Sequence, residues 1–461
     1  MDDNWVAARI DRLPITSIHR RLMWIVAIPL FFDVSDIFTF AYAAPALRDR
    51  WRLSLDDVAL ITAAGFLGMA FGGALGGVIA DRIGRVKAMM LFTAIFSIFS
   101  LANGFAGDTT TLLATRFLTG IGISSATVSV ITYIAEMFPA KVRGRWQAWA
   151  MVIGLSGIPI TSWIARAVVP LGDDGWRWIF IWGAFGLPFL MLSRRLEESP
   201  RWLARSGRGP AAEAALTRLE TAIEHESGPL PAPRRSDQPA TPELKWASLF
   251  SPAYRRRTLA LCGVWFFQTI GFYGFMSWVP TLLAQHGFAV VRSLTFVSLI
   301  NLGAIPGALF AVYISERAER KHSITAVALV IALFGLLYGL TFNPVLIVMF
   351  GFLAGTAMDT FSALCFAYTP EQYPTDVRNS GTGLAYGVGR LANVVNPFVI
   401  SALYAALGYG TVFAYIAGAW VITAMIAFFF GARTTGRSLE TIASEPIQPI
   451  IAMNLNPEPA P

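Results

Sequence analysis

The chain has 461 residues, of which 55% are hydrophobic and 14% charged, and its mean hydropathy is +0.55. This composition excludes a soluble globular protein of that size and indicates a protein that resides in a lipid bilayer. The formal net charge of +7 does not indicate nucleic-acid binding, because the basic residues are distributed as a membrane topology requires.

Twelve apolar segments run along the chain. Crossing the hydrocarbon core takes roughly 20 mostly apolar residues per helix, and the segments that qualify begin near residues 22, 58, 88, 111, 146, 176, 258, 293, 323, 345, 380 and 410. Their length predicts helices and not the strands of a barrel. We therefore expect an all-α integral membrane protein with twelve transmembrane helices.

The basic residues orient these helices. If the N-terminus faces the cytoplasm, 28 of the 36 Lys and Arg residues fall on the cytoplasmic side, six fall on the opposite side, and Arg116 and Arg390 lie within the membrane. This asymmetry predicts that both termini are cytoplasmic. The short outer loop after the first span, with no cysteine-stapled ectodomain, favours a bacterial inner membrane.

A polar, Pro-rich stretch divides the spans into two sets of six. We expect an N-terminal half over residues 1–193, a cytoplasmic linker over 194–257, a C-terminal half over 258–431 and a cytoplasmic tail over 432–461. Aligning the first half of the chain with the second half reveals an internal repeat. A single offset places Tyr133 on Tyr368 and aligns "YIAEMFPAKVR" with "YTPEQYPTDVR" and "DRIGR" with "ERAER". Two pseudo-symmetric six-helix halves of this kind are typical of secondary transporters, which bind substrate between the halves.

The first half carries three charges inside its spans. Asp33 and Asp36 lie in the first span, three residues apart on one helical face, and Arg116 lies in the fourth. Burial away from cations favours the protonated form of a carboxyl group. Over the whole chain the spans contain three acids, Asp33, Asp36 and Asp359, and two arginines, Arg116 and Arg390, so one acid lacks a permanently charged partner. We therefore predict that Asp33 and Asp36 form a proton-coupling site tuned by Arg116; the alternative is that one of them forms a salt bridge between helices.

Two further charges lie in the second half, Asp359 in the tenth span and Arg390 in the eleventh. A charge at the bilayer centre costs about 2.5–3.5 kcal/mol on insertion scales, so such residues are functional candidates. A guanidinium group can receive an organic anion, and Asn393 and Asn396 could extend a polar stripe from it. The alternative is a permanent structural pair between Arg390 and Asp359.

Opposite charges gather at the predicted cytoplasmic helix ends of both halves. They indicate a gate whose pairs bridge the halves, each exposed pair contributing about 0–1 kcal/mol, although ordinary anchoring charges would look the same. The gate residues predicted in this way are Asp81, Arg82, Arg85, Glu136, Arg143, Glu316, Arg317, Glu371 and Arg378. The second half has Glu319 where the first has Gly84, so we expect a looser turn there.

Glycines recur four residues apart in three spans. They are Gly68, Gly72 and Gly76 in the second, Gly303 and Gly307 in the eighth, and Gly383 and Gly387 in the eleventh. Small residues at this spacing let membrane helices approach closely, so we expect these faces to be packed.

Four motifs carry a resemblance to the major facilitator superfamily over essentially the whole chain. "VIADRIGRVK" after Gly77 and "RFLTGIG" at Arg116 are similar to signatures of that superfamily, and "EESPRWL" and "TGRSLE" to elements of sugar porters, organic-ion transporters and niacin-type permeases. "FFDVSDIFTFAYAAPAL" resembles the first helix of niacin-type and aromatic-acid proton symporters. The resemblance implies that the first, fourth, seventh and tenth helices line a central path.

The same resemblance extends to the second half. "GVGRLANVVNP" resembles the eleventh helix of organic-anion transporters, whose arginine engages the substrate. "WFFQTIGFYG" is similar to their seventh helix, with Trp265, Phe272 and Tyr273 at the matching positions and Gln268 between them. An aromatic cluster beside an arginine suits a flat carboxylate. The predicted substrate site comprises Arg390, Asn393, Asn396, Trp265, Gln268, Phe272, Tyr273 and Asp359.

These observations predict a monomeric, proton-coupled importer of a small organic anion, such as nicotinate or benzoate. A sugar or polyol symporter is the alternative, but a neutral substrate would give Arg390 nothing to bind and Gln268 is the single amide in the seventh helix. A drug exporter or a membrane sensor without transport activity is less favoured. No catalytic motif, metal-ligand spacing or cofactor motif indicates an enzyme, and Cys262 and Cys365 suggest no disulfide framework.

Overall fold

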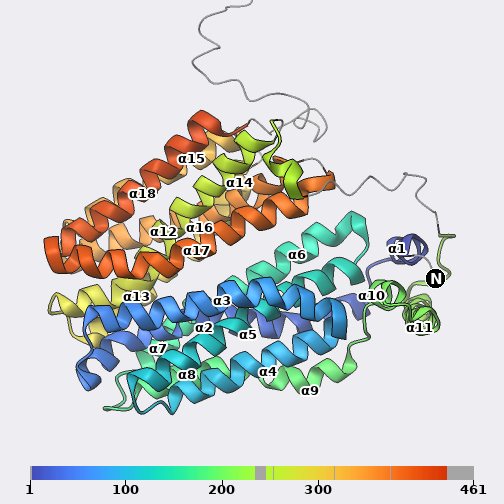
Figure 1. The fold of residues 1–461 in the computed structure, drawn as a ribbon, viewed down its shortest axis with the longest axis horizontal. Helices are drawn as coiled ribbons and strands as arrows, with labels where there is room; N and C mark the ends of the chain where they lie inside the picture. Colours follow the sequence, from blue (N-terminus) through green and yellow to red (C-terminus); the bar gives the residue numbers. More distant parts are fainter. Residues whose placement is uncertain (1–2, 234–245, 253, 316, 374, 433–461) are drawn as a thin grey trace, which may run out of the picture. The chain divides into compact units, whose positions relative to one another are not determined.

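A computed structural model describes the chain except for residues 1–2, 234–245, 253, 316, 374 and 433–461. In the described part every regular element is a helix, and no strand occurs there (Figure 1). That part contains 12 helical segments long and apolar enough to cross a membrane. The prediction of an all-α protein with twelve spans is confirmed.

The chain divides into two compact units, and unit 1 comprises residues 1–53 and 60–239. Its first four spans are α2 (Ser17–Trp51), α3 (Leu55–Ile83), α4 (Arg85–Gly104) and α5 (Thr109–Met137). The fifth span is broken into α6 (Ala140–Leu155) and α7 (Gly157–Val168), and the sixth contains α8 (Trp176–Gly183), α9 (Pro188–Leu192) and two short 3-10 turns. Outside the spans lie α1 (Asp3–Asp11), α10 (Pro200–Arg205) and α11 (Gly209–Ser227).

Unit 2 comprises residues 54–59 and 240–461. After a 3-10 turn at Trp246–Phe250, its spans are α12 (Arg255–Gln285), then α13 (Val290–Asn301) and α14 (Ala304–Ser315) as one broken span, α15 (Arg320–Gly339), α16 (Pro344–Glu371), α17 (Thr375–Leu407) and α18 (Tyr409–Phe430). Since α12 and α17 pack along each other, residues of the seventh and eleventh spans share one part of this unit.

Capping residues fix where several helices begin. Asp108 precedes α5 and accepts a hydrogen bond from the backbone N–H of Thr111 at 2.9 Å, and Asn343 caps α16 in the same way through Val345. The bonds from the backbone N–H and the hydroxyl group of Thr111 lower the pKa of Asp108. Side-chain caps satisfy N–H groups that a helix leaves unpaired in its first turn.

Glycines on α3 permit a close helix crossing. A Cβ atom at Gly68 would lie 2.0 Å from the Phe117 carbonyl oxygen of α5, and one at Gly72 would lie 2.3 Å from that of Ile121. In unit 2 Gly303 and Gly307 approach α16 in the same manner. The packing prediction is confirmed for these two spans and is wrong for Gly383 and Gly387 in α17, where an added Cβ would meet nothing within 4 Å.

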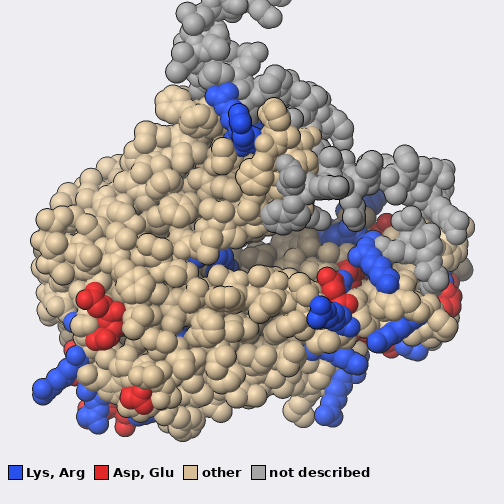
Figure 2. Space-filling model, viewed as in Figure 1, with Lys and Arg blue, Asp and Glu red and all other residues tan. Residues whose placement is uncertain are grey.

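Large apolar side chains cover the outer faces of the spans. Trp24, Phe71, Leu309 and Val345 are each at least half exposed. In Figure 2 the surface over the spans is mostly uncharged, and over unit 1 the Lys, Arg, Asp and Glu side chains gather near the helix ends. An extended apolar exposed surface of this kind suits contact with lipid tails and not with water.

The internal repeat holds at the level of individual contacts. Arg85 pairs with Glu136 in unit 1, and Arg320 pairs with Glu371 at the positions of unit 2 that the repeat aligns with them. The hydroxyl group of Tyr133 donates to the Glu197 carbonyl oxygen at 2.6 Å. In the same register, the Tyr368 hydroxyl group donates to the Ala432 carbonyl oxygen at 2.7 Å. These matching contacts support the predicted pseudo-symmetry of the two halves.

Candidate functional site

The buried charges of unit 1 form an ion pair between α2 and α5. Nη1 of Arg116 lies 3.1 Å from Oδ2 of Asp36, and the two side chains are 7% and 0% exposed. The hydroxyl group of Ser100 on α4 donates to Oδ1 of Asp36, and Thr39 adds a longer contact at 3.4 Å. Asp36 therefore has hydrogen-bond donors at both carboxylate oxygens, which a buried charge requires.

A close helix approach encloses this pair. A Cβ atom at Gly183 on α8 would lie 2.3 Å from Oδ1 of Asp36 and 2.5 Å from the hydroxyl oxygen of Ser100, so only glycine fits there. The guanidinium group of Arg116 also lies 5.9 Å from the centre of the Phe40 ring. The sequence analysis missed Thr39, Ser100 and Gly183, because small polar residues inside apolar spans carry no distinctive pattern.

Asp33 has a different partner from Asp36. It is buried, and the hydroxyl group of Thr127 on α5 donates to its Oδ2. Thr127 lies eleven residues from Arg116, about 16 Å along the helix axis. The two aspartates thus contact different parts of α5, which differs from the expectation of one shared site.

In unit 2, Arg390 lies on α17 against α12. Its Nη1 donates to the hydroxyl oxygen of Tyr273 at 3.4 Å, and its side chain is partly buried. No ion pair joins it to any carboxylate among the described residues, so the alternative of a permanent pair with Asp359 is not observed there. Its positive charge is available to an anion.

Three aromatic rings pack together about one turn of α17 before Arg390. The Trp265 ring lies 4.3 Å from the Tyr386 ring and 5.1 Å from the Phe366 ring, between centroids, with edge-to-face tilts. The indole N–H of Trp265 donates to the Thr369 hydroxyl oxygen at 2.9 Å, which fixes the orientation of the ring. Tyr386 precedes Arg390 by four residues on the same face of α17, about 6 Å along the axis. We call these three residues the aromatic trio.

The three predicted amides have different surroundings. Asn396 is used in packing, since it donates to the Ile270 carbonyl oxygen at 3.2 Å and accepts from Tyr415 at 3.2 Å. Gln268 donates to the neighbouring Thr269 hydroxyl oxygen at 2.8 Å. Asn393 is 1% exposed, and neither polar atom of its amide has a hydrogen-bond partner among the described residues. Of the three, Asn393 retains the most capacity to bind a polar group.

The remaining predicted substrate residues lie on either side of this region. The Phe272 ring is 5.2 Å from the Tyr273 ring, so it supports the side chain that contacts Arg390. Asp359 lies on α16 next to α14. A Cβ atom added at Gly307 of α14 would be 3.0 Å from the Cβ atom of Asp359. The structure therefore brings Trp265, Tyr273 and Arg390 into one region and places Asp359 at another helix crossing.

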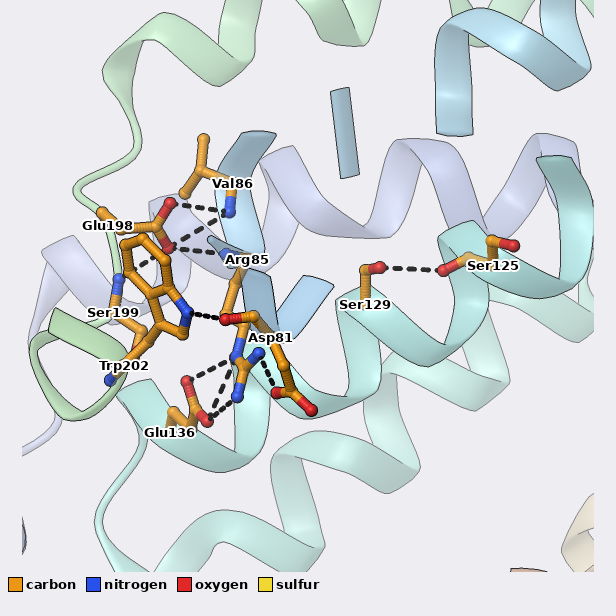
Figure 3. Close-up of polar contacts among 9 residues, drawn as sticks. All are labelled: Asp81, Arg85, Val86, Ser125, Ser129, Glu136, Glu198, Ser199 and Trp202. Carbon is orange, nitrogen blue, oxygen red and sulfur yellow. Dashed lines mark hydrogen bonds and ion pairs between the residues drawn. The ribbon is translucent and has the colours of Figure 1, made fainter. Parts of the chain in front are cut away.

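Figure 3 shows three of the predicted gate residues of unit 1, Asp81, Arg85 and Glu136, joined to one another. Nη1 of Arg85 lies 2.5 Å from Oδ1 of Asp81, and its Nη2 lies 2.9 Å from Oε1 of Glu136. Arg85 and Glu136 are almost fully buried, whereas Asp81 is 70% exposed. The network links α3, α4 and α5 within the unit.

Glu198, from the "EESPRWL" motif, completes this network. Its carboxylate accepts hydrogen bonds from the backbone N–H groups of Arg85 at 2.9 Å and Val86 at 3.2 Å, which caps α4 (Figure 3). The Trp202 indole N–H donates to the Asp81 carbonyl oxygen at 2.7 Å. Gly84 has φ +104°, and a Cβ atom there would be 2.4 Å from Oε2 of Glu198. Sequence analysis quoted this motif but gave Glu198 no role.

The other predicted gate residues are less engaged. Arg82 and Arg143 form no ion pair with a described residue, and Arg317 lies 4.1 Å from the centre of the Tyr313 ring. Glu316 and the side chain of Arg378 lie outside the described residues. Glu319 adopts φ −62°, so the second half makes this turn without the left-handed conformation of Gly84. No group of three or more His, Cys, Asp or Glu side chains in the described part could hold a metal ion.

Residues 31–445 match the model of the family described as "Sugar (and other) transporter". The chain therefore belongs to this family of the major facilitator superfamily: it is a membrane transporter and not an enzyme. This agrees with its twelve spans and its repeated halves.

Bacterial transporters are among its relatives. YyaJ of Bacillus subtilis strain 168, whose name assigns it to metabolite transport, is 44% identical over 438 residues and aligns with 94% of this chain and 96% of its own. The niacin transporter NiaP of Acinetobacter baylyi is 29% identical over 95% of this chain and 99% of its own. A gallate transporter of Pseudomonas putida is 29% identical over 87% and 89%.

The fold also matches a solved structure. The xylose transporter XylE from E. coli, in a partially occluded inward open conformation, superposes with a TM-score of 0.74 and covers 92% of this chain and 100% of its own. The sequence identity is 18%, so this match concerns the fold alone.

Proposed function

We propose that this transporter imports a small organic anion together with protons, and that the anion is an aromatic or heteroaromatic monocarboxylate such as nicotinate or benzoate. The observation that carries the proposal is Arg390, a guanidinium group within a membrane span that has no carboxylate partner among the described residues. A permanently charged group inside a membrane span without a carboxylate partner is costly, and a bound anion lowers that cost.

The surroundings of Arg390 support a flat substrate. A guanidinium group binds a carboxylate through two parallel hydrogen bonds, and the aromatic trio lies about 6 Å away along α17. That separation suits one aromatic ring that contacts Tyr386 and Trp265 while its carboxylate contacts Arg390. The names of the niacin and gallate transporters also fit such a substrate class.

Proton coupling is assigned to the acidic stretch of α2. Asp36 and Arg116 form a buried pair whose charges can separate when Asp36 takes up a proton, and Asp33 lies one turn away with Thr127 as a partner. The proton carried at this site balances the charge of one monoanion, so the pH gradient drives uptake. The transporter acts as a monomer in the bacterial inner membrane with both termini in the cytoplasm.

The gate is a further part of this proposal. The networks around Arg85 and around Arg320 hold each unit together at the end where the α3–α4 and α14–α15 connections lie. We assign opening and closing at that end to these charged residues, among which the Asp81 carboxylate of unit 1 is 70% exposed.

Transport by the purified protein in proteoliposomes tests the function. A pH gradient, acid outside, should drive uphill uptake of labelled nicotinate or benzoate, and a protonophore should abolish it. Xylose serves as the comparison substrate, because a sugar symporter is the competing function within this family. Accumulation of xylose without carboxylate transport, or uphill carboxylate uptake that survives the protonophore, would contradict the proposal.

A further inference from the structure

Asp359 is a carboxylate near the middle of a membrane span. The span is α16, which begins at Pro344 and ends at Glu371. Asp359 is about 22 Å from the first of these residues and about 18 Å from the second along the helix axis, so it is far from both membrane surfaces. Its side chain is partly buried, which leaves part of it accessible.

The helix that faces Asp359 offers no partner for a negative charge. Gly303, which precedes α14, and Gly307 of α14 face this stretch of α16, and a Cβ atom at Gly307 would meet the Asp359 Cβ at 3.0 Å. The one hydroxyl group known to bond at this crossing is that of Thr360, which donates to the Gly307 carbonyl oxygen at 3.0 Å. The crossing is therefore built from glycine, backbone and the hydroxyl groups of Thr356 and Thr360, and that of Thr356 has no hydrogen-bond partner among the described residues.

No described residue forms an ion pair or a hydrogen bond with Asp359. The helices α13, α14, α15 and α17 pack against α16, and α12 and α18 contact it through Trp265 and Trp420. The described ionisable side chains of these helices are Arg292, Tyr313, Arg320, Lys321, His322, Tyr338, Tyr386, Arg390, Tyr404, Arg255, Arg256, Arg257, Cys262, Tyr273, Tyr409 and Tyr415. Arg292 contacts Phe288 and Phe296, Arg320 contacts Glu371, Arg390 contacts Tyr273, and the arginines of α12 lie in its first turn. An acid so placed is most easily accommodated in its neutral form.

The span opposite Asp359 is broken at the same level. α13 ends at Asn301 and α14 begins at Ala304, so the break at Leu302 and Gly303 lies about one helical turn from Gly307. Interrupted spans in transporters mark sites where substrates and coupling ions bind. The fifth span of unit 1 is also broken, and there Gly157 of α7 would place a Cβ atom 2.5 Å from the Ser35 hydroxyl oxygen, between Asp33 and Asp36.

Asp359 also shares a helix face with the substrate region. Phe366 of the aromatic trio follows it by seven residues, which places both side chains on one face of α16 about 10 Å apart along the axis. The aromatic trio and Asp359 therefore both lie within unit 2 on one face of α16.

We propose that Asp359 binds a second transported proton, in addition to the one assigned to the acidic stretch of α2. Hydronium on the outer side gives a proton to a carboxylate oxygen, which forms an O–H bond and leaves water. On the cytoplasmic side that O–H bond breaks, water accepts the proton, and the carboxylate is regenerated. Two protons per monoanion move one net positive charge inward. This inference rests on the proposed function.

Uptake driven by a membrane potential tests the inference. Proteoliposomes of the full chain receive labelled nicotinate or benzoate under either a pH gradient or an inside-negative potassium diffusion potential. One net charge per cycle lets a tenfold potassium gradient drive up to about tenfold accumulation. The variants are Asp359→Asn, Asp359→Glu and the control Ser362→Ala, whose hydroxyl group donates to Met358 within α16.

Wild type, Asp359→Glu and Ser362→Ala are expected to accumulate substrate under both driving forces. Asp359→Asn should lose accumulation driven by the potential, so that its ratio of potential-driven to pH-driven uptake falls well below that of wild type. The inference is overturned if wild type does not respond to the potential, or if Asp359→Asn responds as wild type does. If Asp359→Asn does not reconstitute, the wild-type response to the potential decides. Absence of pH-driven carboxylate uptake by wild type would instead reject the proposed function.

Discussion

The two units treat their membrane charges differently. In unit 1 the buried acid and base of α2 and α5 are joined, with Asp36 and Arg116 3.1 Å apart. In unit 2 Asp359 and Arg390 form no pair with each other among the described residues, and Arg390 contacts a tyrosine hydroxyl group instead. Unit 1 thus holds Asp36 and Arg116 as a closed, neutral pair, whereas in unit 2 the guanidinium group of Arg390 and the carboxyl group of Asp359 are separate.

The internal repeat makes this difference informative. In the register of the repeat, Asp36 and Arg116 fall on the glycines Gly271 and Gly351, so unit 2 has no equivalent of the buried pair. The pair at the helix ends, in contrast, occurs in both units as Arg85–Glu136 and Arg320–Glu371. The repeated contacts hold helices together, and the proposed function assigns the binding and movement of cargo to the unrepeated charges.

Breaking the buried pair of unit 1 should have the largest effect on stability. Asp36→Asn leaves the guanidinium group of Arg116 buried without its anion, which costs about 3–5 kcal/mol. Thermal unfolding in detergent should show a large loss for this variant. The double variant Asp36→Asn with Arg116→Gln should recover at least half of the loss, and the control Asp359→Asn should change stability little. Equal losses for Asp36→Asn and Asp359→Asn would refute the contrast between the units.

The turn before α4 should be the next most sensitive position. Gly84→Ala forces a side chain into a conformation with φ +104° and against Glu198, which should cost about 1–3 kcal/mol. At the equivalent position of unit 2, Glu319→Ala should stay within about 0.5 kcal/mol of wild type, because φ there is −62°. The same unfolding assay compares the two, and similar losses would show that the turns do not differ as described.

Substituting Tyr386 should distinguish aromatic from aliphatic carboxylates. An aromatic pair contributes about 0.5–1.5 kcal/mol, so Tyr386→Leu should weaken binding of benzoate or nicotinate by about 2- to 10-fold. Competition assays should show a smaller change for butyrate, which has no ring. Phe398→Leu, on the same helix but 42% exposed, serves as the control. A uniform loss for all carboxylates would mean that the aromatic trio does not contact the ring.

The smallest effect concerns the attachment of α1 to α11. Burial alone would raise the pKa of Glu220, but hydrogen bonds from Arg9 and Arg12 outweigh burial and lower it. A lowered pKa means that the carboxylate contributes stability above about pH 4.5, and that this contribution is lost as the pH falls through the folded-state pKa. We expect about 0.5–1 kcal/mol.

Hydrogen exchange of residues 3–11 measures that contribution. After correction for the intrinsic exchange rate, Glu220→Gln should exchange faster than wild type at pH 7, and the difference should shrink as the pH falls below about 4.5. A constant difference across this range would exclude ionisation of Glu220 as the cause.

Much of the architecture could be predicted from the sequence. The twelve spans follow from local hydropathy, and the repeat follows from one alignment offset, so neither depends on tertiary contacts. The partners of the buried charges could not be predicted, because the Ser100 and Thr127 hydroxyl groups meet Asp36 and Asp33 only when separate helices pack. Glu198 caps α4 across more than one hundred residues of chain, which no local pattern reveals.

Substrate affinity of an Arg390 variant tests the central claim most directly. Binding of nicotinate and benzoate to the purified protein is measured by calorimetry for wild type, Arg390→Ala and the control Arg292→Ala. Hydrogen bonds to a charged group contribute about 1.5–3 kcal/mol, so Arg390→Ala should bind about 10- to 100-fold more weakly, and the control should match wild type. Affinity for both carboxylates within twofold of wild type in Arg390→Ala would contradict the account.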